Sequence, residues 1–382
     1  MKPLAPALAG LVAVLTAACS GDTAASGSLG PATGEGDDGW PFAVEEVDRL
    51  DEPWAMAFLP DTGDLLITER SGTLHLRDAD SGERTEVGGV PEVVDAGQGG
   101  LGDVLPAPSY AEDGMVYLSW VEAGDGGTGA VVGRAELDTS GPRLDDLEVL
   151  WRQTPKVDGD GHFSHRLAFS PDGEHLFVSS GDRQLGAPDQ DTTNTLGTIV
   201  RLTPDGEPAP GNPLADRGGV SAEIWTWGHR NPLGLEVAPD GTLWSSEMGP
   251  EGGDELNVIE AGSNYGWPEV SDGSDYGGGE IPDHAEGDGF TAPARSWNPS
   301  ISPGSLMIYD GEMFEDWRGD AFLGALSGEA LVRVDLDGRT AGDTEVFDMG
   351  ARIRAVEEGP DGAIWVLEDE GAGRLLRLTP AG

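Results

Sequence analysis

A cationic residue and an oxygen-rich loop lie one hairpin apart in this sequence. Arg230 and Asn231 directly precede an apolar stretch, and the acidic, glycine-rich loop 249–255 follows the next apolar stretch. Arginine can form a forked pair with a carboxylate. Gly and Pro carbonyls, together with acidic oxygens, are ligands that Ca²⁺ prefers. The stretch therefore suits a site that holds an anionic organic group beside a hard metal ion.

A histidine-bearing loop offers a candidate general base. His162 lies in a loop rich in Gly and Asp, immediately before an apolar strand that includes Leu167. Imidazole is the natural base near neutral pH. Asp182 follows the strand expected to pair with the first one, where a carboxylate could orient the imidazole. His165 competes for the same role, and the local sequence leaves the choice between the two histidines open.

Two further arginines are expected beside the same site. Arg352 and Arg354 are two residues apart on an expected strand, so their side chains should point to one side. With Arg230 they would concentrate positive charge in a very acidic chain. The alternative is that each arginine pairs with a neighbouring Asp or Glu. Gln98, in a glycine-rich segment, is favoured as a turn residue on local evidence.

The overall charge excludes several classes of partner. The 382 residues include 70 Asp and Glu against 22 Lys and Arg, a formal net charge of −48. Such a charge repels nucleic acid and anionic lipid, and we interpret it as a solvated acidic surface. The single cysteine excludes an intrachain disulfide.

The N-terminus is typical of an exported protein. Residues 1–19 combine Lys2 with an apolar run too short for a comfortable membrane span. Cys19 follows two alanines and resembles a bacterial lipoprotein attachment site, with plain secretion as the alternative. Residues 20–39 have the composition of a flexible tether. We therefore expect a cell-surface lipoprotein or a secreted or periplasmic protein, with membrane contact only through an N-terminal lipid anchor.

The remaining chain, residues 40–382, repeats one pattern. An apolar strand, a turn rich in Pro, Asp and Gly, and a second apolar strand recur, with turn aspartates at Asp61, Asp113, Asp172, Asp240, Asp320 and Asp361. Repeats of this size are typical of propellers, so the sequence predicts an all-β, six-bladed β-propeller. A β-sandwich or two smaller β-domains is the alternative. The widest interval predicts a long insertion around 273–292 at one mouth of the channel.

Many motifs, in order from about Trp54 to the C-terminus, match one bacterial family. They include segments 97–101, 162–163, 190–191, 197–203, 227–232, 253–257, 264–268 and 352–354. On these motifs the chain resembles the soluble aldose sugar dehydrogenases that use pyrroloquinoline quinone (PQQ), relatives of soluble glucose dehydrogenase. The resemblance implies a six-bladed propeller with the quinone at the top of its axis.

The resemblance also implies roles for individual residues. His162 would be the general base and Asp182 its orienting partner. Gln98, Arg230, Asn231, Tyr276, Arg352 and Arg354 would contact the quinone. Gly249 and Pro250 would present carbonyls to the Ca²⁺ that also binds the cofactor, and Glu255 and Tyr265 would bind a further structural Ca²⁺. Two positions depart from the family pattern, since Gly161 replaces an acidic residue and Ser327 replaces a lysine near the quinone.

The reaction that the resemblance implies is oxidation of an aldose at C1 to a lactone. His162 would take the hydroxyl proton, the hydride would pass to the quinone, and Arg230 would stabilise the developing oxyanion. A small-molecule sugar would be the substrate, and the electron acceptor and the choice between monomer and homodimer stay open. The alternatives are a Ca²⁺-dependent lactonase or esterase and a non-catalytic propeller that binds glycans or protein. The pair Arg352 and Arg354 argues against the hydrolase, which has no need of a cationic clamp.

Overall fold

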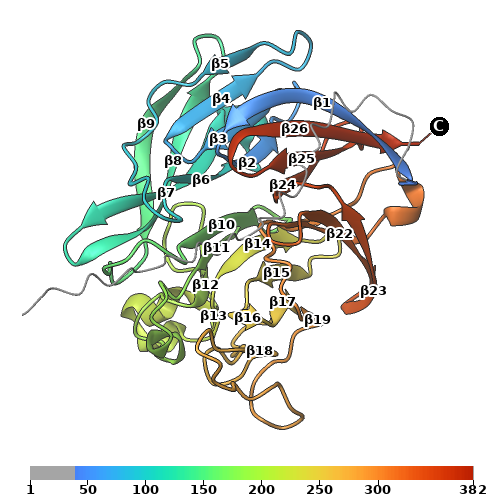
Figure 1. Cartoon of the computed structure of the whole chain (residues 1–382). Helices are drawn as coiled ribbons and strands as arrows, with labels where there is room; N and C mark the ends of the chain where they lie inside the picture. The colour runs from blue at the N-terminus through green and yellow to red at the C-terminus, as the bar shows by residue number, and fades with distance from the viewer. Residues whose placement is uncertain (1–38, 382) are drawn as a thin grey trace, which may run out of the picture.

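The structure is a computed structural model that describes residues 39–381, and it is a six-bladed β-propeller (Figure 1). The six four-stranded blades, each given from its first strand to its last, are β2 (Pro53–Phe58), β3 (Leu65–Glu69), β4 (Thr73–Arg77) and β5 (Arg84–Glu86); β6 (Leu101–Pro106), β7 (Met115–Gly124), β8 (Gly127–Asp138) and β9 (Arg143–Arg152); β10 (Ser164–Phe169), β11 (Leu176–Ser180), β12 (Thr198–Leu202) and β13 (Ile224–Trp227); β14 (Pro232–Val237), β15 (Leu243–Glu247), β17 (Asp254–Val258) and β19 (Arg295–Trp297); β20 (Met307–Ile308), β21 (Ala321–Ala325), β22 (Ala330–Asp337) and β23 (Thr340–Asp348); and β24 (Ile353–Glu358), β25 (Ile364–Glu368), β26 (Gly371–Pro380) and β1 (Phe42–Asp51).

The repeated turn aspartates mark the blades, as predicted. All six lie in the connection between the first and second strands of a blade. The predicted fold is therefore confirmed, and the sandwich and two-domain alternatives are wrong. The first strands of neighbouring blades contact one another, for example β2 with β6 and β24 with β2, so they surround the axis.

The second strand of a blade is the most deeply buried element. All five residues are buried in each of β3, β11, β15, β21 and β25. A propeller blade is covered on both faces by its neighbours, so these strands need apolar or small side chains on both sides. This explains why they appear in the sequence as continuous apolar runs and not as an alternation of polar and apolar residues.

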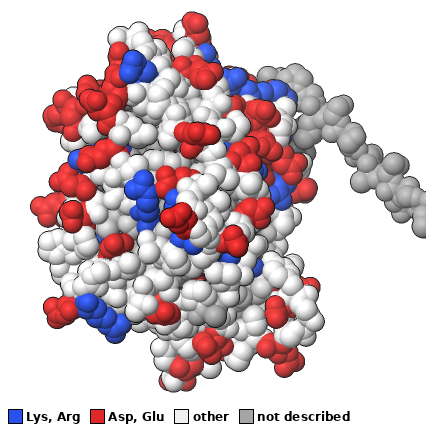
Figure 2. Space-filling model, turned by 90° about the vertical axis from the view of Figure 1, so that its left-hand side faces the viewer, with Lys and Arg blue, Asp and Glu red and all other residues white. Residues whose placement is uncertain are grey.

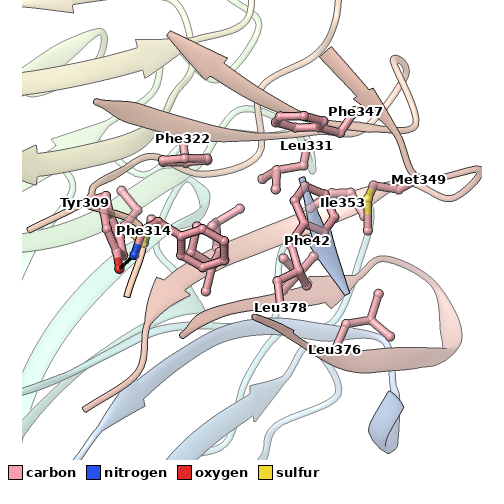
Figure 3. Close-up of a cluster of buried hydrophobic side chains, with 14 of the residues drawn as sticks. Phe42, Tyr309, Phe314, Phe322, Leu331, Phe347, Met349, Ile353, Leu376 and Leu378 are labelled. Atoms are coloured by element: carbon pink, nitrogen blue, oxygen red, sulfur yellow. Dashed lines mark hydrogen bonds between the residues drawn. The ribbon is translucent and has the colours of Figure 1, made fainter. Parts of the chain in front are cut away.

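Hydrophobic clusters lie between neighbouring blades and close the ring. The cluster between the fifth and sixth blades contains Phe42, which is 1% exposed, with Phe347 at a ring-centroid distance of 5.0 Å (Figure 3). Phe42 belongs to β1, which pairs antiparallel with β26 as the outer strand of the last blade (Figure 1). The two ends of the described chain thus share one blade, and burial of a side chain such as Phe42 stabilises this closure by about 1.5–3 kcal/mol.

Other elements are short. They are α1 (Tyr110–Asp113), η1 (Ala187–Gln190), η2 (Ala215–Arg217), η3 (Gly219–Glu223), η4 (Glu315–Trp317), β16 (Glu251–Gly252) and β18 (Gly273–Ser274). Between residues 39 and 381, none of the helices has the length and apolar character needed to cross a membrane. The predicted insertion lies between β17 and β19 of the fourth blade, where β18 pairs with β16. The export signal at 1–19 and nearly all of the tether at 20–39 lie outside the described residues.

Acidic side chains are spread over the surface. Figure 2 shows Asp and Glu across most of one face, with few Lys and Arg among them. Several of these arginines pair with acids on the same surface, such as Arg134 with Glu148 at 3.1 Å. This distribution is what a solvated acidic surface requires.

Candidate active site

The loop that carries His162 has an unusual backbone. His162, Ser164 and His165 have φ values of +49°, +60° and +56°. The register of β10 against β11 shifts between Ser164 and Leu167, which marks a β-bulge. Non-glycine residues in this left-handed region cost of order 1–2 kcal/mol each, and such strain clusters at functional sites. The bulge turns His162 away from the ladder and toward a cavity.

His162 forms a buried pair with Asp182. Its Nδ1 lies 2.6 Å from Asp182 Oδ1, and the exposed fractions of the two residues are 5% and 1%. Trp267 Nε1 donates to the other carboxylate oxygen at 3.0 Å, and the Gln184 amide donates to Oδ1 at 2.7 Å. Because an ionised Asp182 only accepts hydrogen bonds, His162 donates from Nδ1 and keeps Nε2 as an acceptor. This is the arrangement of a general base with an orienting carboxylate.

The competing histidine has a structural role. His165 is 1% exposed, stacks on Trp54 at 5.1 Å, and has Nδ1 2.8 Å from Ser119 Oγ. Burial, together with the positive charge of Arg166, lowers the pKa of His165 to about 3. The structure therefore favours His162 over His165 as the base.

The predicted site residues line two adjoining cavities. A cavity of about 560 Å³ is lined by His162, Asp182, Arg230, Pro250, Trp267 and Tyr276, among others. A cavity of about 600 Å³ is lined by residues that include Gln98, Asn231, Arg352 and Arg354. The two meet where Gln98 Oε1 accepts a hydrogen bond from the His162 amide at 2.7 Å. Gln98 is thus more than a turn residue, because it holds the catalytic loop.

Arg230 is a buried cation whose hydrogen bonds go to neutral groups. It is 6% exposed, and Nη1 donates to the carbonyls of Met248 and Gly249 at 2.9 and 2.7 Å. Nη2 donates to the Tyr276 hydroxyl at 3.3 Å, and among the described residues Nε has no partner. The alternative of local pairing with an acid is therefore wrong for Arg230. A buried charge without a counter-ion is costly, which points to an anionic ligand.

Arg352 and Arg354 do point to one side, where they share one carboxylate. Nε of each donates to a different oxygen of Asp369, at 2.9 and 3.0 Å. Burial alone would raise the pKa of Asp369, but the two guanidiniums, Arg354 first, outweigh it and lower that pKa. Glu370, 3.2 Å from Arg352, is exposed to solvent and screened. Local pairing thus holds for these arginines, and two cations on one buried acid leave positive charge at the cavity wall.

Two buried residues that were given no role in advance position Arg230. Glu247 Oε2 accepts from the Arg230 amide at 2.7 Å, and Glu247 Oε1 lies 2.8 Å from His229 Nδ1. His229 is fully buried, and its ring stacks on Tyr265 at 4.5 Å. Both residues fall in family-like motifs, which is the signal that could have found them. Their contacts with Arg230 appear only in the folded chain.

The predicted metal ligands lie around a third, small cavity. Gly249, Glu255 and Tyr265 line a space of about 10 Å³, which is room for one water-sized group. Burial and the charge of Glu247 raise the pKa of Glu255, against His284 and Asn257. The Tyr265 hydroxyl donates to the Val258 carbonyl, so only its own carbonyl is available to an ion. Among the described residues, no three His, Cys, Asp or Glu side chains are grouped to hold a metal.

Known proteins share both the fold and the sequence. Residues 50–377 match the Glucose / Sorbosone dehydrogenase family. Aldose sugar dehydrogenase YliI of Escherichia coli K12 is 39% identical over 340 residues, covering 87% of this chain and 91% of that protein. A crystal structure of a glucose dehydrogenase is 42% identical with a TM-score of 0.84, covering 88% and 99% of the two chains. The PQQ-bound aldose sugar dehydrogenase of Streptomyces coelicolor is 33% identical with a TM-score of 0.75, covering 88% and 98%. The chain therefore belongs to the glucose/sorbosone dehydrogenase family and is a sugar-oxidising enzyme of the quinoprotein class.

Proposed function

We propose that the protein oxidises aldose sugars at C1 to lactones, with PQQ and Ca²⁺ as cofactors. One observation carries the proposal. The pair of His162 and Asp182 lies on the same cavity as Arg230, a buried cation whose hydrogen bonds go to neutral groups. A base and a cation without a counter-ion, facing one space, suit removal of a hydroxyl proton beside an anionic electron acceptor.

The residues present fit an anionic quinone. PQQ carries three carboxyl groups, and Arg230, Arg352 and Arg354 place three guanidiniums on the walls of the two adjoining cavities. Gln98 and Asn231 add polar side chains between them. When bound, the quinone would supply the hydride acceptor. The protein supplies position, charge and a base.

Each step assigned to the chain follows from a contact. His162 Nε2 takes the proton of the C1 hydroxyl, because Asp182 holds Nδ1 and stabilises the imidazolium that forms. Trp267 and Gln184 keep Asp182 in place. Arg230, held by Glu247 through its main chain, stabilises the negative charge that develops beside it.

The Ca²⁺ ligands that we propose are the carbonyls of Gly249 and Pro250. The Gly249 carbonyl accepts from Arg230 Nη1 at 2.7 Å and keeps a second lone pair for an ion. A dication beside a guanidinium is repelled unless an anion lies between them. Ca²⁺ binding at this position should therefore depend on the quinone. Glu255 and the Tyr265 carbonyl stay our prediction for a separate structural Ca²⁺.

Reconstitution tests the proposed function directly. The purified apoprotein should show dye-linked oxidation of sugars only after both PQQ and Ca²⁺ are added. The absorbance of the quinone would confirm loading, and a panel of aldoses and alcohols would give the substrate class. The proposal fails if the loaded protein oxidises nothing in the panel. Lack of quinone binding would instead favour the propeller that binds glycans or protein.

The hydrolase alternative finds less support in the geometry. It needs carboxylate and amide ligands that converge on an open site at the axis. The axial carboxylates Asp103, Glu236 and Glu357 line a deeper space, separate from the cavity of His162. The cavity next to that of His162 presents Arg352 and Arg354 instead.

Ser327 allows a test of the charge in the quinone site. Its hydroxyl lies 2.7 Å from that of Ser302, which lines the 600 Å³ cavity. Ser327→Lys should tighten quinone binding, by up to about fivefold at low salt, because an exposed charge pair contributes about 0.2–1 kcal/mol. The gain should shrink at high salt. Quinone titrations would measure it, with Ser327→Gln as the neutral control; an equal gain from Gln would show that charge is not the cause.

A further inference from the structure

A separate chamber lies on the propeller axis, deeper than the candidate active site. Its volume is about 150 Å³, and residues of β2, β6, β10, β14 and β24 line it together with residues 305–306. Trp54 and Leu233 line the 600 Å³ cavity, whereas Met56 and Glu236, further along the same strands, line the chamber. We call this space the axial chamber. It is built by all six blades.

One charge pair in the axial chamber is complete in itself. Arg166 Nη1 donates to Asp103 Oδ1 at 3.2 Å, and the Leu167 amide donates to Oδ2 at 2.8 Å. The other donors of Arg166 reach the carbonyls of Leu233 and Gly304, each at 2.8 Å, and its guanidinium packs on Trp54 at 4.0 Å. Arg166 therefore neutralises Asp103 and has no donor left for another carboxylate.

Two other carboxylates in the chamber have no such partner. Burial, and the charges of Asp103 and Glu358, raise the pKa of Glu236 to about 8. Burial, and first among the charges that of Glu236, raise the pKa of Glu357 well above its usual value, while Arg166 lowers it less. No hydrogen bond to another described residue favours ionisation of either group. Two acids that repel each other in this way lie close together across the axis.

A third oxygen on the chamber is also unused. Ser305 is 4% exposed, and its Oγ has no hydrogen-bond partner among the described residues. Buried hydroxyls are nearly always paired, so an unpaired one facing a cavity indicates a missing ligand or water. Oxygen atoms from the fourth blade (Glu236), the sixth blade (Glu357) and the segment entering the fifth (Ser305) thus surround one space.

We propose that the axial chamber binds one Ca²⁺ between Glu236 and Glu357, with Ser305 Oγ and water as further ligands. The two carboxylates carry two negative charges, which a single divalent cation balances. The chamber has room for about five water-sized groups, enough for an ion and part of its hydration shell. Ca²⁺ accepts six to eight oxygen ligands in irregular geometry, whereas Mg²⁺ requires a near-ideal octahedron. The ion would tie together blades on opposite sides of the axis.

The proposed ion is distinct from the Ca²⁺ of the quinone site. Gly249, Pro250, Glu255 and Tyr265 do not line the axial chamber. Counting bound Ca²⁺ therefore separates the two. Equilibrium dialysis of the full chain should show one Ca²⁺ per chain fewer for the double variant Glu236→Gln/Glu357→Gln than for the wild type. The matched control is Glu83→Gln/Glu112→Gln, which removes two exposed acids and should leave the count unchanged.

Thermal unfolding gives a second readout. At a Ca²⁺ concentration one hundred times Kd, the Tm of the wild type and of the control should rise by about 5 °C or more, and this part of the rise should be lost in the double variant. Mg²⁺ should have a smaller effect. Equal Ca²⁺ counts and equal Tm shifts for wild type and double variant would overturn the proposal; they would mean that the two acids share protons instead of an ion.

Crystals of the wild type keep the proposal testable if the double variant does not fold. Data collected with Ca²⁺ at a wavelength where calcium scatters anomalously should show a peak between Glu236 and Glu357. A chamber without such a peak at saturating Ca²⁺ would contradict the proposal.

Discussion

His162→Gln is expected to lower kcat of the reconstituted enzyme by about 10²–10⁴, the usual contribution of a positioned general base. Quinone affinity should be retained, because the described side chain of His162 faces Asp182 and contacts the quinone walls only through its loop. Asp182→Asn should also lower kcat strongly, since an amide at this place can donate to Nδ1 and thereby turn the imidazole to the wrong tautomer. Steady-state oxidation of an aldose at saturating quinone measures both effects.

The controls for this prediction are built into the chain. His175→Gln changes a histidine that lines an outer cleft far from the pair and should leave kcat unchanged. Quinone titration of each variant separates loss of base from loss of cofactor. Turnover near the wild-type rate in His162→Gln would reassign the base, and loss of quinone binding in the same variant would show that the loop, and not the imidazole, was disturbed.

Arg230→Gln is expected to have the second-largest effect. It removes a buried cation from the wall that faces the base, so quinone affinity should fall, and kcat at saturating quinone should fall by about 10²–10³. Arg230→Lys should recover part of the affinity, because it restores the charge, but less of kcat, because the forked geometry is lost. Quinone binding and single-turnover oxidation measure the two quantities separately.

Stability must be followed in the same experiment. The Met248 and Gly249 carbonyls each lose a donor in Arg230→Gln, which costs about 1–3 kcal/mol for each buried acceptor left unpaired. A denaturant titration would show whether the variant remains folded under assay conditions. Arg217→Gln, in the exposed η2, is the matched control and should change neither binding nor turnover. Wild-type kcat in folded Arg230→Gln would contradict the role proposed for the guanidinium.

The fold could be predicted because its determinants are local. Each turn between the first and second strands of a blade needs Pro, Asp and Gly, whose backbone preferences act over a few residues. The apolar second strands follow from burial on both faces, as β3 and β25 show. Recurrence of this unit is sufficient for a propeller, since no blade can bury both faces alone. The closure of the last blade by β1 was not predicted, because it joins residues from opposite ends of the chain.

The base could be predicted for the same reason. His162 and Asp182 flank a single hairpin, β10 and β11, so their approach follows from the pairing of adjacent strands. The choice against His165 could not, because it depends on the bulge that turns one histidine into the cavity and on the burial of the other against Trp54. A bulge of one residue leaves no clear trace in apolar periodicity.

What the sequence by itself determined is the inventory: six repeats, a base with its carboxylate, and an arginine beside an oxygen-rich loop. Tertiary structure alone decided which charges are neutralised. Asp369 is shared by Arg352 and Arg354, whereas Arg230 remains without an acid even though acids outnumber bases about threefold in the sequence. Likewise, Glu236 and Glu357 meet only because the ring brings the fourth and sixth blades to one axis. Pairing of charges depends on distance and burial, and both are set by contacts between residues far apart in the chain.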